Sequence, residues 1–193
     1  MPVTPAHSGQ DLQAQIRHRV ANTFHFLAAL ARLRAQKGQD LTPAQSLAWM
    51  ADTIVDLGTL ERFVRDDQVD IKAYLSAMAG VWRDRYRHLK IQVVLDLCPL
   101  TLHEAVAQSV ALAILELVAN AATHVFHGGE AHEIRLDLRL GSGTYVLTIS
   151  SSGHSMAPSS EPFGLWLAKS LVQQIKGELA VSPAGMATLS FKV

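Results

Sequence analysis

His18 stands among polar residues that share one face of a helix predicted at the start of the chain. Four of them stack above and below it at offsets of −7, −3, +4 and +7: Asp11, Gln15, Asn22 and His25. A neutral imidazole that faces solvent is nucleophilic at physiological pH and can carry a phosphoryl group on nitrogen. The alternative interpretation is a solvated surface histidine, because the chain has 9 histidines.

A second group with chemical potential lies on a helix that is otherwise apolar. Glu116, Asn120 and His124 are four residues apart and therefore share one helical face. Burying such groups costs free energy unless they are paired or contact a ligand. The pattern fits either a satisfied polar seam between helix and loop or a ligand site.

Two amphipathic helices are predicted in the first third of the chain. One runs over about residues 10–35, and after KGQD the second begins at the cap Thr42 followed by Pro43. Their seams are formed by Ile16, Val20, Leu27 and Leu30, and by Leu47, Met50, Ile54, Leu57 and Val64. A short loop makes them an antiparallel hairpin. One hairpin leaves apolar residues uncovered, which predicts a homodimer that closes a four-helix bundle.

The rest of the chain mixes helices and strands. Helices are predicted at about 71–87, 103–126 and 163–175, and strands at 91–97, 133–140 and 145–150, with ELAVSP and ATLSFKV finishing the sheet. The turn 141–143 joins two strands as a hairpin. The fold class is therefore α+β, with a helical hairpin domain over residues 1–68 and a two-layer sandwich over residues 69–193.

Composition excludes several classes of function. The formal net charge is +0 and charged residues make up 18% of the chain, which argues against binding nucleic acid. The apolar stretch 105–122 is interrupted by polar residues and predicts a buried helix, with no membrane association. The sequence contains no HExxH motif, so no metal site is predicted. The basic cluster over residues 83–90 is predicted to be a solvated helix end. One cysteine, Cys98, and a start without a secretion signal favour the cytoplasm.

The residues around His18 resemble a known motif. His18-Arg19-Val20-Ala21-Asn22, followed by apolar heptads, is similar to the HRVKN phosphoacceptor box of the HWE and related non-classical histidine kinases. The resemblance implies that His18 is the phosphoacceptor, with Arg19 and Asn22 as its companions in the box. Ala21 stands where the family usually has lysine, and Gln15 stands where it often has an acidic residue.

The helix that carries Glu116 also has a family counterpart. Residues 115–124, LELVANAATH, resemble the N box of the histidine-kinase ATPase domain of the Bergerat or GHKL type, typically NELVTNAxKHAF. The resemblance implies that Asn120 binds magnesium, Glu116 orients the metal-bound water and His124 lies near the phosphates. Thr123 replaces the usual lysine and removes a phosphate-neutralising charge. Both boxes stand in the family's order.

The remaining nucleotide elements depart from the family pattern. Where the family has Asp-x-Gly-x-Gly, this chain has SSGHS, so Ser151 takes the place of the aspartate that holds adenine. Only ten residues separate Gly153 from Gly164, and Gly164 is one remaining glycine of the GLGL element. Glu116, Asn120, His124, Gly153 and Gly164 would then form a vestigial ATP and magnesium site.

These features predict a histidine phosphotransfer protein derived from a histidine kinase. His18 would accept a phosphoryl group from a phospho-aspartate of one response-regulator receiver domain and pass it to another, without a required cofactor. Residual ATP and magnesium binding stays open. The alternatives are an active orphan autokinase with altered ATP contacts and a non-catalytic protein that binds response regulators.

Overall fold

The computed structural model describes residues 9–38, 41–123, 132–152 and 162–192, and they form two compact units, 1–50 and 51–193, described here separately. The helices are α1 (Gly9–Lys37), α2 (Pro43–Glu61), α3 (Ile71–Arg85), the 3-10 helix η1 (Arg87–Leu89), α4 (Glu104–Thr123) and α5 (Phe163–Gln174). The strands are β1 (Val64–Arg65), β2 (Gln68–Asp70), β3 (Ile91–Leu97), β4 (Thr101–His103), β5 (His132–Gly141), β6 (Thr144–Ser151), β7 (Glu178–Val181) and β8 (Ala187–Phe191).

The first unit holds α1 and the beginning of α2, as the hydrophobic periodicity predicts. Thr42 and Gln45 form a capping box at the start of α2. The Gln45 amide nitrogen of the backbone donates to Thr42 Oγ1 at 3.3 Å, and the Thr42 backbone N–H donates to Gln45 Oε1 at 2.8 Å. The Arg34 guanidinium lies 5.5 Å from the centre of the Trp49 ring, a cation–π contact within this unit. The predicted cap at Thr42 is therefore confirmed.

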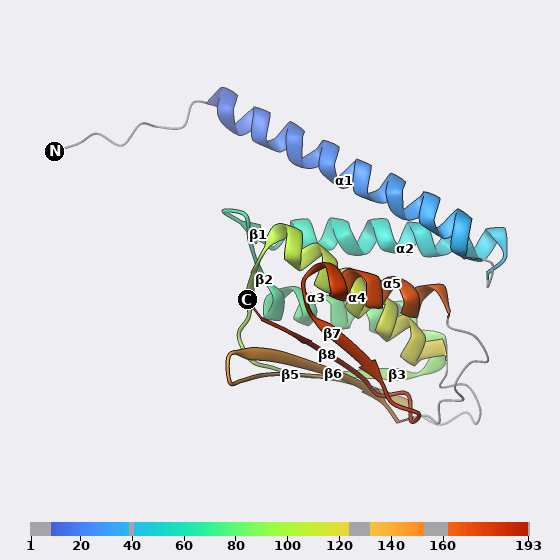
Figure 1. The fold of residues 1–193 in the computed structure, drawn as a ribbon. Coiled ribbons are helices and arrows are strands. Elements are labelled where there is room, and N and C mark those ends of the chain that lie inside the picture. Colours follow the sequence, from blue (N-terminus) through green and yellow to red (C-terminus); the bar gives the residue numbers. More distant parts are fainter. Residues whose placement is uncertain (1–8, 39–40, 124–131, 153–161, 193) are drawn as a thin grey trace. The chain divides into compact units, whose positions relative to one another are not determined.

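The second unit is a two-layer α+β sandwich, which confirms the predicted fold class. Its main sheet has the strand order β3-β5-β6-β8-β7, and every pairing is antiparallel except that of β3 with β5. Figure 1 shows α3, α4 and α5 together on one face of this sheet. Strand β5 fits this arrangement, because Ile134, Leu136 and Leu138 are buried while Arg135 and Arg139 on its other face are exposed.

Helix α4 supplies the centre of the core. Every residue from 110 to 118 is buried, so this helix is covered on all sides there. It is long and apolar enough to cross a membrane by length and composition, but 67% of the window 104–122 is buried inside the protein. Burial on this scale is typical of a core helix and agrees with the prediction for residues 105–122.

The region that joins α2 to α3 differs from the prediction. Helix α2 ends at Glu61, and Val64, predicted as part of its seam, pairs with Val69 in the hairpin of β1 and β2. The turn between them places Asp66 and Asp67 at φ values of 48° and 59°, which short polar side chains tolerate. The seam prediction for Val64 is wrong because the chain turns two residues before it.

The predicted apolar seams divide into covered and uncovered residues. Leu30 and Leu57 are buried, as is Leu60, which flanks the second seam. Three other seam residues, Val20, Leu47 and Ile54, are exposed by 49%, 73% and 48% of their surface, and Phe24, which flanks the first seam, is exposed by 66%. Heptad spacing thus identified apolar helix faces, and the bundle that would cover the exposed ones stays a prediction.

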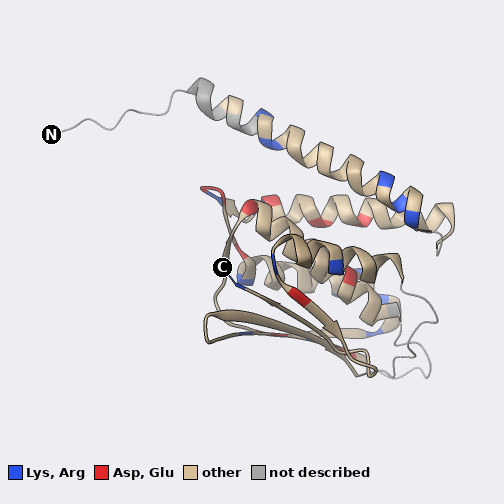
Figure 2. Ribbon diagram, in the orientation of Figure 1, with Lys and Arg blue, Asp and Glu red and all other residues tan. Residues whose placement is uncertain are grey.

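Charged residues of both signs are spread over the described elements. Figure 2 shows Lys and Arg along the coloured part of α1, Asp and Glu along α2, and both signs on the elements that follow. This distribution agrees with the formal net charge of +0.

Candidate functional site

His18 lies on α1 with its side chain exposed to solvent, as its spacing from the apolar residues predicts. The Asn22 side-chain nitrogen is 3.2 Å from His18 Nδ1, one helical turn away. Arg19, the other residue of the box, is half-buried, and its carbonyl oxygen accepts a hydrogen bond of 3.1 Å from Thr23 Oγ1. The structure therefore brings His18 and Asn22 together on an accessible face.

The contact with Asn22 determines what each nitrogen of the imidazole can do. When Asn22 donates to Nδ1, the neutral ring carries its proton on Nε2. Half a turn of the amide instead presents Asn22 Oδ1 to an Nδ1–H, and the Nε2 lone pair is then free to attack phosphorus. Only the arrangement in which Nδ1–H donates to Asn22 Oδ1 leaves the Nε2 lone pair available, so attack through Nε2 uses that arrangement.

The second group centres on Glu116, which is only 8% exposed although it carries a carboxylate. Its Oε2 atom lies against the Cα of Gly164 at the start of α5, where an added Cβ would collide with it. Glycine at this position lets the carboxylate approach the backbone of α5, and a side chain there would force the carboxylate to shift. The structure therefore joins two predicted site residues that are 48 positions apart in the chain.

Of the other predicted residues of this site, the structure describes some and not others. Asn120 is half-buried on α4, one turn after Glu116, while His124 and Gly153 lie outside the described residues. Ser151, in the position of the family's aspartate, is the last residue of β6 and is half-buried. Its neighbour Ser152 ties the end of this strand to β5, because Ser152 Oγ accepts a hydrogen bond of 2.9 Å from the backbone N–H of Glu133.

The described residues fit one half of a magnesium–nucleotide site better than the other. Carboxylate and amide oxygens such as those of Glu116 and Asn120 are ligands that magnesium prefers. At the adenine end, Ser151 offers a neutral hydroxyl in place of a carboxylate, so a charge-assisted hydrogen bond to the adenine amino group is lost. The donor set is thus suited to the metal and weakened for the base.

An ion pair buried in the second unit was not expected from the sequence. Arg85 donates two hydrogen bonds to the Asp56 carboxylate, at 2.9 and 2.7 Å, and its Nε lies 3.3 Å from Asp52. Asp56 is 2% exposed. Burial is the largest influence on this carboxyl and raises its pKa, while the hydrogen bonds from Arg85 act in the opposite direction. The prediction of a solvated helix end is therefore wrong for Arg85, whose guanidinium pairs with the carboxylates of Asp52 and Asp56 on α2.

The surroundings of this ion pair join the second half of α2 to α3. Tyr74 is fully buried, and its ring packs edge-on against Phe63 with centroids 6.1 Å apart. The Tyr74 hydroxyl has no hydrogen-bond partner among the described residues, and burial raises its pKa. The 29-residue separation of Asp56 and Arg85 explains why no local pattern indicated the pair.

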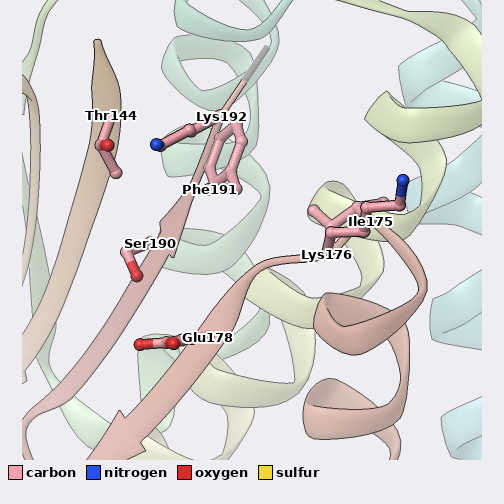
Figure 3. Close-up of a pocket in the computed structure, with 7 residues that line it drawn as sticks. All are labelled: Thr144, Ile175, Lys176, Glu178, Ser190, Phe191 and Lys192. Atoms are coloured by element: carbon pink, nitrogen blue, oxygen red, sulfur yellow. The ribbon is translucent and has the colours of Figure 1, made fainter.

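A shallow cavity of about 430 Å³ opens in the second unit, away from the candidate residues. Figure 3 shows its lining at the end of the sheet where β6 begins, formed by Thr144, Ile175, Lys176, Glu178, Ser190, Phe191 and Lys192. Ser151 stands at the other end of β6, roughly 23 Å along the strand. This cavity contains none of the predicted site residues.

Comparison with known proteins gives matches in structure alone. No protein-family model matches the chain, and no curated protein matches it in sequence. The histidine kinase domain of the Erythrobacter litoralis EL346 blue-light activated histidine kinase is similar with a TM-score of 0.70 and 18% identity, over 92% of this chain and 91% of that domain.

Two further solved structures, a longer chain of the same kinase and one other kinase, show the same fold. Against the longer EL346 chain the TM-score is again 0.70 with 18% identity, and the match covers 100% of this chain and 62% of that one. This chain therefore spans less than two thirds of that kinase. The Acinetobacter baumannii histidine kinase AdeS has a TM-score of 0.54 and 18% identity, over 91% of this chain and 96% of its own. The chain has the fold of a histidine kinase core.

Proposed function

We propose that this chain is a histidine phosphotransfer protein of a two-component phosphorelay, with His18 as the phosphoacceptor. The observation that carries the proposal is the accessible imidazole of His18, whose Nδ1 is engaged by Asn22 at 3.2 Å within a box that resembles HRVKN. The histidine-kinase fold supports two-component signalling as the setting. The loss of the aspartate at position 151 favours a carrier over an enzyme that uses ATP.

Phosphotransfer requires few catalytic groups from the carrier itself. His18 Nε2 attacks the phosphorus of an acyl phosphate on a receiver aspartate, so that the P–N bond forms, the P–O bond breaks and the carboxylate leaves with the electron pair. The second transfer reverses these steps on another receiver domain. Because the receiver brings its own magnesium and acidic pocket, the carrier supplies a positioned nucleophile and a docking face. The proposal places the protein in the cytoplasm, with receiver domains as partners.

Two labelling reactions test the proposal. The purified protein is first incubated with γ-labelled ATP and magnesium, and then separately with a labelled, phosphorylated receiver domain. A carrier takes up label from the receiver and not from ATP. Label from ATP would make the protein an autokinase, and no label from either donor would favour a regulator that only binds response regulators.

The autokinase is the second candidate, because Glu116 and Asn120 keep the oxygen donors of a magnesium site. We expect Ser151→Asp to raise the affinity for magnesium–ATP by about 10-fold or more, since a charge-assisted hydrogen bond contributes roughly 1.5–3 kcal/mol. Titration calorimetry measures the change.

Ser150→Asp is the matched control for this substitution. Successive residues of a strand face opposite sides of the sheet, so this variant adds the same charge away from the site. We expect its affinity to equal that of the unaltered protein. If the unaltered protein already binds ATP as tightly as Ser151→Asp does, the idea of a weakened adenine site is wrong.

The exposed apolar residues of the hairpin support a homodimer as part of the proposal. Phe24 is 66% exposed, more than a stable monomer ordinarily tolerates beside other exposed apolar residues. We expect Phe24→Glu to weaken dimerisation at least about 10-fold, because burying a phenylalanine contributes roughly 1.5–3 kcal/mol. Sedimentation equilibrium measures the dissociation constant.

Gln36→Glu adds the same charge at an exposed position of the same helix and serves as the control. We expect it to leave the dissociation constant unchanged. A monomeric unaltered protein, or equal weakening by both substitutions, would contradict a dimer formed through this face.

A further inference from the structure

The retention of Glu116 needs an explanation in a protein proposed to work without ATP. The Glu116 side chain is 8% exposed and its carboxylate touches the Cα of Gly164. A buried carboxylate is costly unless hydrogen-bond donors or positive charge compensate it. The element that it touches is the first turn of α5, whose backbone N–H groups are hydrogen-bond donors.

The start of α5 has such donors. The first backbone N–H groups of a helix have no partner within the helix. At α5 the N-cap is Pro162, whose side chain makes no capping hydrogen bond, and the first backbone bond formed across the turn is from Trp166 N–H to Pro162 O at 3.1 Å. The N–H groups of Phe163, Gly164 and Leu165 therefore point toward the N-terminal end of α5, next to the carboxylate that touches Gly164.

We propose that Glu116 is the N-terminal anchor of α5. Its carboxylate accepts hydrogen bonds from the amides of the first turn and meets the positive end of the helix dipole. Gly164 allows this approach, because a Cβ there would collide with the carboxylate and displace it. The carboxylate thus takes the position that the phosphate of a ligand would otherwise have at this helix end.

This inference rests on the proposed function in one respect, namely that Glu116 is kept without a need for ATP. Its physical content is independent of that function, because an anchor stabilises the fold in the absence of metal and nucleotide. A residue whose role is to bind magnesium does not stabilise the fold when magnesium is absent. Substitution of an anchor lowers stability without metal and nucleotide, whereas substitution of a magnesium ligand changes stability only when they are bound.

The test compares thermal unfolding of the full chain in EDTA for Glu116→Ala, Glu116→Gln and the control Glu104→Gln, a half-buried glutamate of the same helix. We expect the midpoint to fall by about 5 °C for Glu116→Ala and by less for Glu116→Gln, whose amide oxygen can still accept. Glu104→Gln should change it by no more than about 1 °C. Equal midpoints for all variants would overturn the proposal.

Gly164→Ala supplies a second measurement that general destabilisation does not mimic. Its effect should be smaller in the Glu116→Ala background than in the unaltered protein, because the colliding carboxylate is absent there. Additive effects would show that the two residues do not act together and would overturn the anchor.

Adding magnesium and ATP separates the anchor from a metal ligand. We expect the shift of the midpoint that they cause to be the same in the unaltered protein and in Glu116→Gln. A shift that disappears in Glu116→Gln would show that the carboxylate holds metal and would overturn the inference. Failure of the anchor leaves the phosphotransfer proposal standing, since no receiver domain enters this experiment.

Discussion

Replacing His18 by alanine is expected to abolish acceptance of label from a phosphorylated receiver domain. The imidazole is the nucleophile of the proposed transfer, and its Nδ1 is engaged by Asn22. Label on the chain after denaturing electrophoresis at neutral pH measures the effect, because phosphohistidine is lost in acid. We expect the signal to fall to background while the protein stays folded, since His18 is exposed.

His25→Ala is the control for this substitution, because His25 is exposed on the same face of α1 two turns later. It should accept label as the unaltered protein does. Asn22→Ala should slow the transfer by roughly 10-fold without abolishing it, the effect of one lost hydrogen bond that positions the ring. Full labelling of His18→Ala would refute the assignment of the phosphoacceptor.

Replacing Arg85 by alanine is expected to lower the free energy of unfolding by about 3–5 kcal/mol. The reason is that Asp56, which is 2% exposed, would keep a buried charge without its bidentate partner. Urea denaturation followed by circular dichroism measures the change. Arg139→Ala is the control, because this arginine also binds an aspartate, Asp96, but on the exposed face of the sheet. We expect no measurable change there.

The deficit of Arg85→Ala should depend on pH. Burial raises the pKa of the Asp56 carboxyl above its ordinary value of 3.8, so the folded state binds a proton more readily than the unfolded chain does. Stability contributed by this group therefore falls as pH rises through the raised pKa and is constant above it. Without Arg85 the pKa rises further, so the deficit should be larger at pH 8 than at pH 5.

The double substitution Asp56→Leu with Arg85→Met separates loss of the ion pair from loss of packing. Replacing a buried ion pair by apolar groups of similar size is often close to neutral. We expect the double variant to regain most of the stability lost in Arg85→Ala. If the double variant is as unstable as Arg85→Ala, the lost stability comes mainly from packing of the Arg85 side chain and not from the unpaired buried charge of Asp56.

This ion pair also bears on how α2 belongs to the fold. The division into compact units falls at 50/51, within α2, and the second half of that helix is grouped with α3 and the sheet. Asp56 and Arg85 connect these two helices inside the second unit. The functional boundary predicted after residue 68 stays a prediction, because compactness and function need not divide a chain at the same residue.

Local sequence determined most of the elements of this protein. The capping residues Thr42 and Gln45 mark the start of α2, and alternation in β5 marks its buried face. The hairpin of β5 and β6 follows from its two-residue turn, in which Ser142 and Gly143 have φ values of 51° and 75°. These features are set by interactions between residues close in the chain, and the sequence records them directly. The resemblance of residues 115–124 to the N box likewise indicated the histidine-kinase fold, which this chain shares with the solved kinase structures.

Tertiary structure alone decided which surfaces are covered and which distant residues meet. Helical spacing assigned both Leu47 and Leu57 to the apolar seam of the second helix, yet Leu47 is exposed and Leu57 is buried. The short strands β1, β2 and β4 have two or three residues each, too few for any periodicity to appear. The contacts of Asp56 with Arg85 and of Glu116 with Gly164 join residues 29 and 48 positions apart. Such pairs depend on how the elements pack, and no local spacing encodes that.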